Sequence, residues 1–268
     1  MQPERLDKLI SQRLCISRKE ARQKIKEGRV SLCGKALLSA EQKIEPGITG
    51  LTADGKPVMT AAYVYIMMNK PAGVLSASRD SKARTVVDLV PEEYRTKGLF
   101  PAGRLDKDTT GFMLITNDGE LAHRLLSPKN KVEKIYRAQL DGPVDRDMIE
   151  AFARGITLRD GTAFLPAKLV GIHPTRNRRG YRPQSPVGLR DIEDDVPYMP
   201  FTAKITIHEG KYHQIKRMFS ACGREVLALE RLRIGGLALD PDLAPGACKL
   251  LGGEEIHLLL KNTAKNCL

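Results

Sequence analysis

The sequence predicts an α+β fold in which a mixed, largely antiparallel sheet forms the main domain and a small α-rich module precedes it. Short strand patterns alternate irregularly with short helix patterns, and few of the long crossovers that join parallel strands occur between them. The N-terminal segment has its own helical periodicity and ends in a linker that contains glycine and proline. The chain of 268 residues is long enough for two domains. We therefore expect one domain at 1–60 and a second at 61–268.

Two helices are predicted in the N-terminal module. The first has apolar residues at helical spacing, namely Leu6, Leu9, Ile10 and Leu14. Ser17 and Glu20 have the spacing of a capping box, so we expect the second helix to begin after Ser17 and to extend to about Glu27. Its apolar residues Ala21 and Ile25 share one face, and that face should be buried.

A basic stripe runs along the second predicted helix. Arg18, Arg22 and Lys26 are spaced by four residues, and Arg29 follows in the next turn. Residues 1–49 contain 11 Lys and Arg against 6 Asp and Glu, a net charge of +5. A charged helix face is ordinarily solvated surface. The alternative is a surface that binds the phosphates of a nucleic acid.

The main domain should contain strands and short helices in an irregular order. Strands are predicted at 63–68, 112–115, 133–140, 168–172, 201–208, 226–230 and 232–239, and helices at 120–126, 144–154 and from about 215 to 222. Residues 174–200 interrupt this order with five prolines, an arginine cluster and an acidic run, and we interpret them as an inserted, mobile loop.

A polar loop at 103–111 is the main candidate for chemistry. It contains Arg104 and Asp106, followed by two threonines and Gly111, and it runs directly into the apolar segment 112–115. A polar loop at the end of a buried strand is a common position for a reactive side chain. Asp106 is the candidate for that side chain. The alternative is that its carboxylate only makes hydrogen bonds within a tight turn.

Composition favours a polyanionic partner and disfavours several other classes. The chain has 44 Lys and Arg against 32 Asp and Glu, which gives a net charge of +12 and favours nucleic acid over an anionic membrane. No apolar run approaches the length of a spanning helix, no signal-peptide core is visible, and the five cysteines form no zinc-ligand pattern. We expect a cytoplasmic protein without a metal. Nucleotide-cofactor fingerprints are absent from the sequence, so no cofactor is expected.

Four segments resemble the motifs of the pseudouridine synthases, in the order of that family, and residues 1–49 resemble the S4 RNA-binding domain. These segments are Asn69 to Gly73, Gly103 to Gly111, Glu133 to Tyr136 and Glu209 to Phe219. Within the superfamily the sequence is most similar to the RsuA-type branch, which contains an S4 domain. Three segments resemble the small-subunit ribosomal RNA enzyme rather than its large-subunit relatives, namely Tyr212 to Phe219, Arg233 to Gly236 and Asp240 to Gly246. The insertion at 174–200 departs from this family's pattern.

The resemblance implies a role for each matching residue. Asp106 corresponds to the catalytic aspartate, Lys216 to its basic partner, and Tyr136 to the tyrosine that packs against the target base. Arg104 would fill or support the space in the RNA stack that the uridine leaves. In the S4 domain, Arg18, Arg22, Lys26 and Arg29 would contact RNA phosphates. Pseudouridine formation needs no redox change or external donor, which fits the expected lack of a cofactor.

The resemblance leaves the substrate and two other functions open. The expected substrate is a uridine of small-subunit ribosomal RNA, either free or in an assembly intermediate, and the protein is expected to act as a monomer. A uridine of large-subunit ribosomal RNA is the first alternative. A noncatalytic RNA-binding protein for ribosome assembly is the second, and Asp106, Tyr136 and Lys216 argue against it. A glycoside hydrolase should pair two carboxylates around the bond, whereas these motifs offer Asp106 with a lysine.

Overall fold

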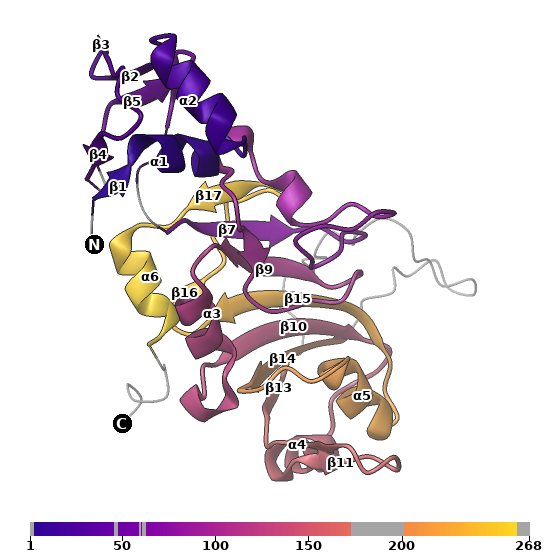
Figure 1. Cartoon of the computed structure of the whole chain (residues 1–268). Helices are drawn as coiled ribbons and strands as arrows, with labels where there is room; N and C mark the ends of the chain where they lie inside the picture. Colours follow the sequence, from indigo (N-terminus) through magenta and orange to yellow (C-terminus); the bar gives the residue numbers. More distant parts are fainter. Residues whose placement is uncertain (1–2, 46–47, 59, 61–62, 173–200, 262–268) are drawn as a thin grey trace, which may run out of the picture.

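The computed structural model describes residues 3–45, 48–58, 60, 63–172 and 201–261. The insertion predicted at 174–200 lies outside the described residues. The N-terminal module stands at one end of the molecule, next to a larger domain built on a long sheet (Figure 1). The predicted α+β class is confirmed. No helix in the described ranges is long and apolar enough to cross a membrane.

The N-terminal module packs two helices on short strands around its own core. Its elements are β1 (Glu4–Arg5), α1 (Leu6–Arg13), α2 (Arg18–Lys26), β2 (Val30–Leu32), β3 (Lys35–Ala36), β4 (Lys43–Ile44), β5 (Leu51–Ala53) and β6 (Lys56–Pro57). The predicted capping box is confirmed, since the Ser17 hydroxyl accepts from the Glu20 N–H and the Glu20 carboxylate accepts from the Ser17 N–H. Ala21 and Ile25 are fully buried, as their spacing predicts.

The larger domain is organised around one mixed sheet. Its strands are β7 (Tyr65–Lys70), β8 (Phe100–Pro101), β9 (Thr110–Thr116), β10 (Lys134–Leu140), β13 (Lys168–Ile172), β14 (Phe201–Ile207), β15 (Val226–Ile234), β16 (Leu237–Ala238) and β17 (Cys248–Leu250). The order across the sheet is β13, β14, β10, β15, β9, β7 and β17, while β8 pairs with β9 and β16 with β15. Among the described ladders of this sheet, β15 with β9 is parallel and the rest are antiparallel.

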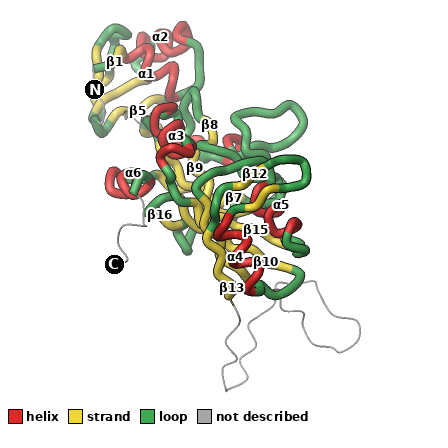
Figure 2. Tube along the Cα trace, turned by 90° about the horizontal axis from the view of Figure 1, so that it is seen from below, coloured by secondary structure: helices red, strands yellow, loops and turns green. Residues whose placement is uncertain are grey.

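Helices and short elements complete this domain. They are α3 (Gly119–Leu126), α4 (Arg146–Arg154), α5 (Gln214–Ala221) and α6 (Gly253–Leu259), the 3₁₀ turns η1 (Val87–Leu89), η2 (Glu92–Tyr94) and η3 (Pro128–Asn130), and the hairpin of β11 (Ile156–Thr157) and β12 (Ala163–Phe164). Asp118 and Asp145 cap α3 and α4 by accepting from backbone N–H groups. Figure 2 shows α6 and α5 on opposite sides of the sheet.

Both faces of the sheet are buried, which explains why the strand predicted at 112–115 is entirely apolar. Successive side chains of a strand point to opposite faces. On β9, Phe112 and Leu114 pack in the core with α3 and α6, whereas Met113 and Ile115 pack in the core with α4 and α5. All four side chains are fully buried. A strand covered on both faces therefore has no polar alternation.

The C-terminal part of the sheet differs from the prediction in two ways. Two strands were expected at 226–230 and 232–239, but β15 continues through Arg231 to Ile234. Arg231 is tolerated in the strand because its buried guanidinium donates to the Phe112 carbonyl at 2.7 Å. The turn falls at Gly235 instead, where an added Cβ would lie 2.1 Å from the Leu259 carbonyl oxygen. The helix α6 was not predicted.

The two domains are joined by contacts at the end of α1. The Arg13 guanidinium donates to the Thr96 hydroxyl at 3.0 Å, and the Lys97 N–H donates to the Gln12 carbonyl at 2.8 Å. The Lys97 ammonium also donates to the Ile16 carbonyl at 2.5 Å. These bonds fix the C-terminal end of α1 to the segment that precedes β8.

Candidate active site

The loop between β8 and β9 holds Asp106 in a fixed position. Lys70, at the end of β7, is fully buried and donates to the carbonyls of Pro71, Lys107 and Thr109 at 3.0, 3.1 and 2.9 Å. Burial lowers the pKa of the Lys70 ammonium to about 8. Two of the three carbonyls belong to Lys107 and Thr109 of the loop, the residues before and after Asp108 in the sequence. The buried amine therefore ties the loop to the sheet.

A serine fixes the residue immediately before Asp106. The Ser76 hydroxyl donates to the Leu105 carbonyl at 2.7 Å and accepts from the Leu105 N–H at 3.0 Å. Leu105 is itself buried among the core residues of α5 and β10. Because the N–H and the carbonyl of Leu105 are both hydrogen-bonded, the direction in which the chain continues to Asp106 is fixed.

Gly111 marks the point where this loop enters the sheet. It has a φ of +94°, which disfavours residues with a side chain. An added Cβ would also lie 2.4 Å from the Arg231 carbonyl oxygen, at the position where β9 and β15 pair. Glycine is needed here for both reasons. Its small size allows β9 to pair with β15 directly after the loop.

A lysine and a histidine approach the Asp106 carboxylate. The Lys216 ammonium lies 3.9 Å from one oxygen of Asp106, and the His213 imidazole lies 3.5 Å from the other. Lys216 also contacts Asp108 at 2.5 Å, so its shorter ion pair is with Asp108. The hydrogen bond from Lys216 lowers the pKa of Asp108. The sequence indicated Lys216 as the partner of Asp106, and the structure adds Asp108 to the same group.

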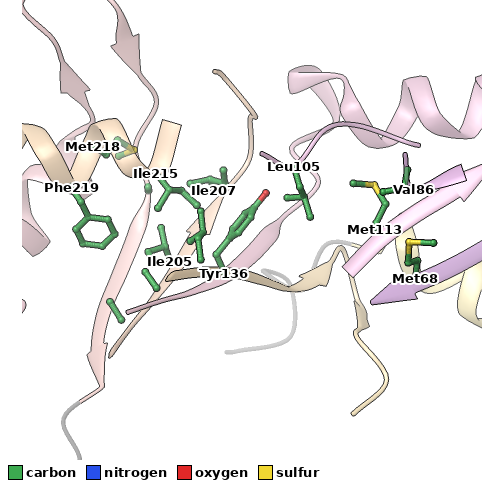
Figure 3. Packing of buried hydrophobic residues seen from close by; sticks show 14 of the residues in the cluster. Met68, Val86, Leu105, Met113, Tyr136, Ile205, Ile207, Ile215, Met218 and Phe219 are labelled. Carbon is green, nitrogen blue, oxygen red and sulfur yellow. The ribbon is translucent and has the colours of Figure 1, made fainter. Parts of the chain in front are cut away.

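Tyr136 reaches the same pocket from the middle of the sheet. Its side chain is buried on β10 and lies between Leu105 and Ile207 (Figure 3). The pocket that contains Asp106 and Tyr136 is also lined by Arg104, which is exposed at its edge. Asp106, Tyr136, Lys216 and Arg104, which lie far apart in the sequence, thus line one pocket.

The connection between β14 and α5 forms the opposite wall of this pocket. Glu209 is buried and accepts from the Leu165 N–H at 2.8 Å and from the Gln214 side chain at 2.9 Å. The helix α5 buries Ile215, Met218 and Phe219, as their spacing predicts. Lys216 projects from the first turn of this helix beside the pocket.

Sequence reasoning missed four contributors to this site. Lys70 belongs to a segment that was recognised as a motif, but its three carbonyl partners were not foreseen. Asp108 was considered only as a turn residue, and the positions of Ser76 and His213 were not foreseen. Each depends on contacts between segments that are distant in sequence, and such contacts leave no local pattern.

One buried carboxylate, that of Asp7, orients two arginines of the basic stripe in the N-terminal module. Asp7 accepts from Arg18 at 2.8 Å, from Arg22 at 2.9 Å and from Arg5 at 3.2 Å. The side chains of Arg18 and Arg22 remain 49% and 56% exposed, so they keep donors free for a ligand on the surface. Lys26 is exposed, and Arg29 is paired with Asp54 at 2.5 Å and with Glu27 at 3.3 Å.

Replacing Asp7 by Asn is expected to destabilise the module at neutral pH by about 1.5–3 kcal/mol, the range for hydrogen bonds to a charged group. Burial raises the pKa of Asp7, but the hydrogen bonds from Arg5, Arg18 and Arg22 outweigh it and lower the pKa. A lowered folded-state pKa contributes stability above the unfolded value of roughly 4, and this contribution is lost as the pH falls below it. Urea unfolding should therefore show the largest difference from wild type at pH 7 and a smaller one at pH 3. An equal difference at both pH values would contradict this account.

Comparisons with known proteins identify the class. The family model described as RNA pseudouridylate synthase matches residues 64–221, and the S4 domain model matches residues 4–47. The chain belongs to the RNA pseudouridylate synthase family, whose members are isomerases, and it carries an N-terminal S4 domain.

Individual relatives match over nearly their whole length. An uncharacterized RNA pseudouridine synthase, YtzG, of Bacillus subtilis is 44% identical over 95% of this chain and 98% of its own. Ribosomal small subunit pseudouridine synthase A of Escherichia coli is 39% identical over 94% of this chain and 98% of its own, and that of Vibrio cholerae is 38% identical over 96% and 100%. A crystal structure of a pseudouridylate synthase superimposes with a TM-score of 0.59 at 33% identity, covering 95% of this chain and 99% of that one.

Proposed function

We propose that this protein converts one uridine of small-subunit ribosomal RNA to pseudouridine, with Asp106 as the catalytic carboxylate. The observation that carries the proposal is the pocket in which the Asp106 carboxylate lies beside Lys216 and His213 and shares its lining with Tyr136. The choice of RNA is supported by the names of the Escherichia coli and Vibrio cholerae relatives. Ribosomal RNA, free or in an assembly intermediate, is the proposed partner of a cytoplasmic monomer.

The reaction breaks the N1–C1′ bond of the uridine, turns the uracil, and forms a C5–C1′ bond. An ionised Asp106 either adds to the substrate as a nucleophile or removes a proton from the sugar, and both roles need a carboxylate that stays charged. The Lys216 ammonium, 3.9 Å from the Asp106 carboxylate, would attract this carboxylate and orient it. Tyr136, which lines the pocket, would pack against the uracil and assist the loss of the proton from C5. None of these steps requires a cofactor.

Substrate RNA would be held by two groups of basic side chains. The uridine must leave its stack to reach Asp106, and Arg104 at the edge of the pocket would occupy the vacated space. Arg18, Arg22, Lys26 and Arg29 of the S4 domain would bind phosphates of the surrounding RNA. We further propose that 1–60 and 61–268 act as the RNA-binding and catalytic domains.

Mapping of pseudouridine in both ribosomal RNAs tests the proposal. Cells that lack this gene should lose pseudouridine at a single small-subunit position, and the wild-type gene should restore it whereas Asp106→Asn should not. Loss of a large-subunit position instead would overturn the choice of RNA. Persistence of every position would overturn the enzymatic proposal and favour a noncatalytic RNA-binding role.

A further inference from the structure

An exposed aromatic side chain lies next to the pocket and is not used in the reaction described above. The Tyr212 side chain is 71% exposed, although a ring of this size is usually at least partly buried. Its ring stacks on the His213 imidazole, with centroids 3.8 Å apart and planes inclined by 17°. The two rings form a flat pair, which we name the Tyr212–His213 pair.

The backbone that presents this pair is held firmly and adopts an unusual conformation. His213 has a φ of +47°, in the left-handed region that residues with a side chain rarely enter. The neighbouring Gln214 donates to the buried Glu209, and the Lys211 N–H donates to the Gln214 side chain. Strained backbone that the surrounding bonds enforce is found most often at functional positions.

The pair extends from the catalytic carboxylate to the surface. His213 Nε2 lies 3.5 Å from Asp106, and Lys211 and His213, the residues on either side of Tyr212, both line the pocket. Tyr212 therefore stands at the mouth of the pocket. Arg104, Lys211 and Lys216 line the same pocket, and Arg104 and Lys211 are exposed.

These features are suited to binding an unstacked nucleobase. Taking a uridine out of its stack exposes the face of an adjacent base, and proteins bind such faces on aromatic rings with basic side chains nearby for the phosphates. We propose that a nucleobase adjacent to the target uridine stacks on Tyr212, with His213 supporting the ring from behind. This inference rests on the proposed function, because it assumes an RNA whose target uridine enters the pocket.

The chain contains no tryptophan, which allows a direct test. Tyr212→Trp places the sole tryptophan at the proposed position, and its fluorescence should be strongly quenched by an RNA transcript that carries the mapped uridine. Ile149→Trp is the control, because Ile149 is also exposed but lies on α4, at the end of the molecule away from the N-terminal module (Figure 1), and does not line the pocket of Asp106. Its fluorescence should change little.

Affinity for the same transcript provides the second measurement. Tyr212→Ala should raise the Kd roughly 5- to 100-fold, the range for loss of one stacked base, whereas Tyr212→Phe should stay within about twofold of wild type. Unquenched Tyr212→Trp together with an unchanged Kd for Tyr212→Ala would overturn the inference. Both measurements report binding, so they decide it independently of catalysis. Failure of the proposed function would appear separately, as absence of pseudouridine after incubation with the wild-type protein.

Discussion

Replacing Asp106 by Asn is expected to reduce the rate of pseudouridine formation by about 10²- to 10⁴-fold if the carboxylate is a general base, and by about 10⁶-fold if it is a nucleophile. The amide has nearly the same size but neither the charge nor the basicity of the carboxylate. Because Asp106 is partly exposed and its neighbours hold the loop through backbone groups, the variant should fold normally. Single-turnover assays on a transcript with the mapped uridine would measure the effect.

Asp108→Asn is the matched control for this prediction. It removes a carboxylate from the same loop and deprives Lys216 of its shorter ion pair. The Asp108 side chain is 69% exposed, and ion pairs at such positions contribute little. We expect its rate to remain within about tenfold of wild type. If the two variants lost activity equally, the assignment of the catalytic role to Asp106 alone would be wrong.

Lys70→Met is expected to lower the free energy of unfolding by roughly 2–4 kcal/mol and to reduce activity as well. Methionine fills a similar volume but removes the donor to three carbonyls, of which the Thr109 bond is buried and the Lys107 carbonyl still accepts from the Gly73 N–H. The cost is about 1–3 kcal/mol for each group that stays unsatisfied. The loop that carries Asp106 would then lose its tie to β7. Urea unfolding and single-turnover assays would measure the two effects on one preparation.

Lys107→Met provides the control for Lys70, since Lys107 lies on the same loop with an exposed side chain. A change at such a surface position usually alters stability by no more than about 0.5 kcal/mol. Equal stability of Lys70→Met and Lys107→Met would show that the buried amine does not hold the loop. Normal stability with lost activity would instead point to a direct role of Lys70 in the reaction.

The sequence by itself determined the fold class and most elements of the larger domain, and it singled out four residues that line one pocket, namely Arg104, Asp106, Tyr136 and Lys216. The α+β class follows from period-two and period-3.6 patterns, which are local properties of the chain. The capping box at Ser17 and Glu20 and the buried stripe of α5 are local in the same sense, and both are confirmed. The requirement for glycine at position 111 came only from the structure, through its positive φ and its contact with Arg231.

The tertiary structure alone decided which side chains are partners. Lys216 pairs with Asp108 across 108 positions of the chain, and Lys70 binds carbonyls 37 and 39 residues away. Arg18 and Arg22 were predicted as an exposed stripe, yet the buried Asp7 orients both. A side chain's partners depend on how strands and helices pack, and periodicity carries no information about packing between distant segments. For the same reason the stacked rings at the mouth of the pocket could be recognised only after folding had brought α5 beside Asp106.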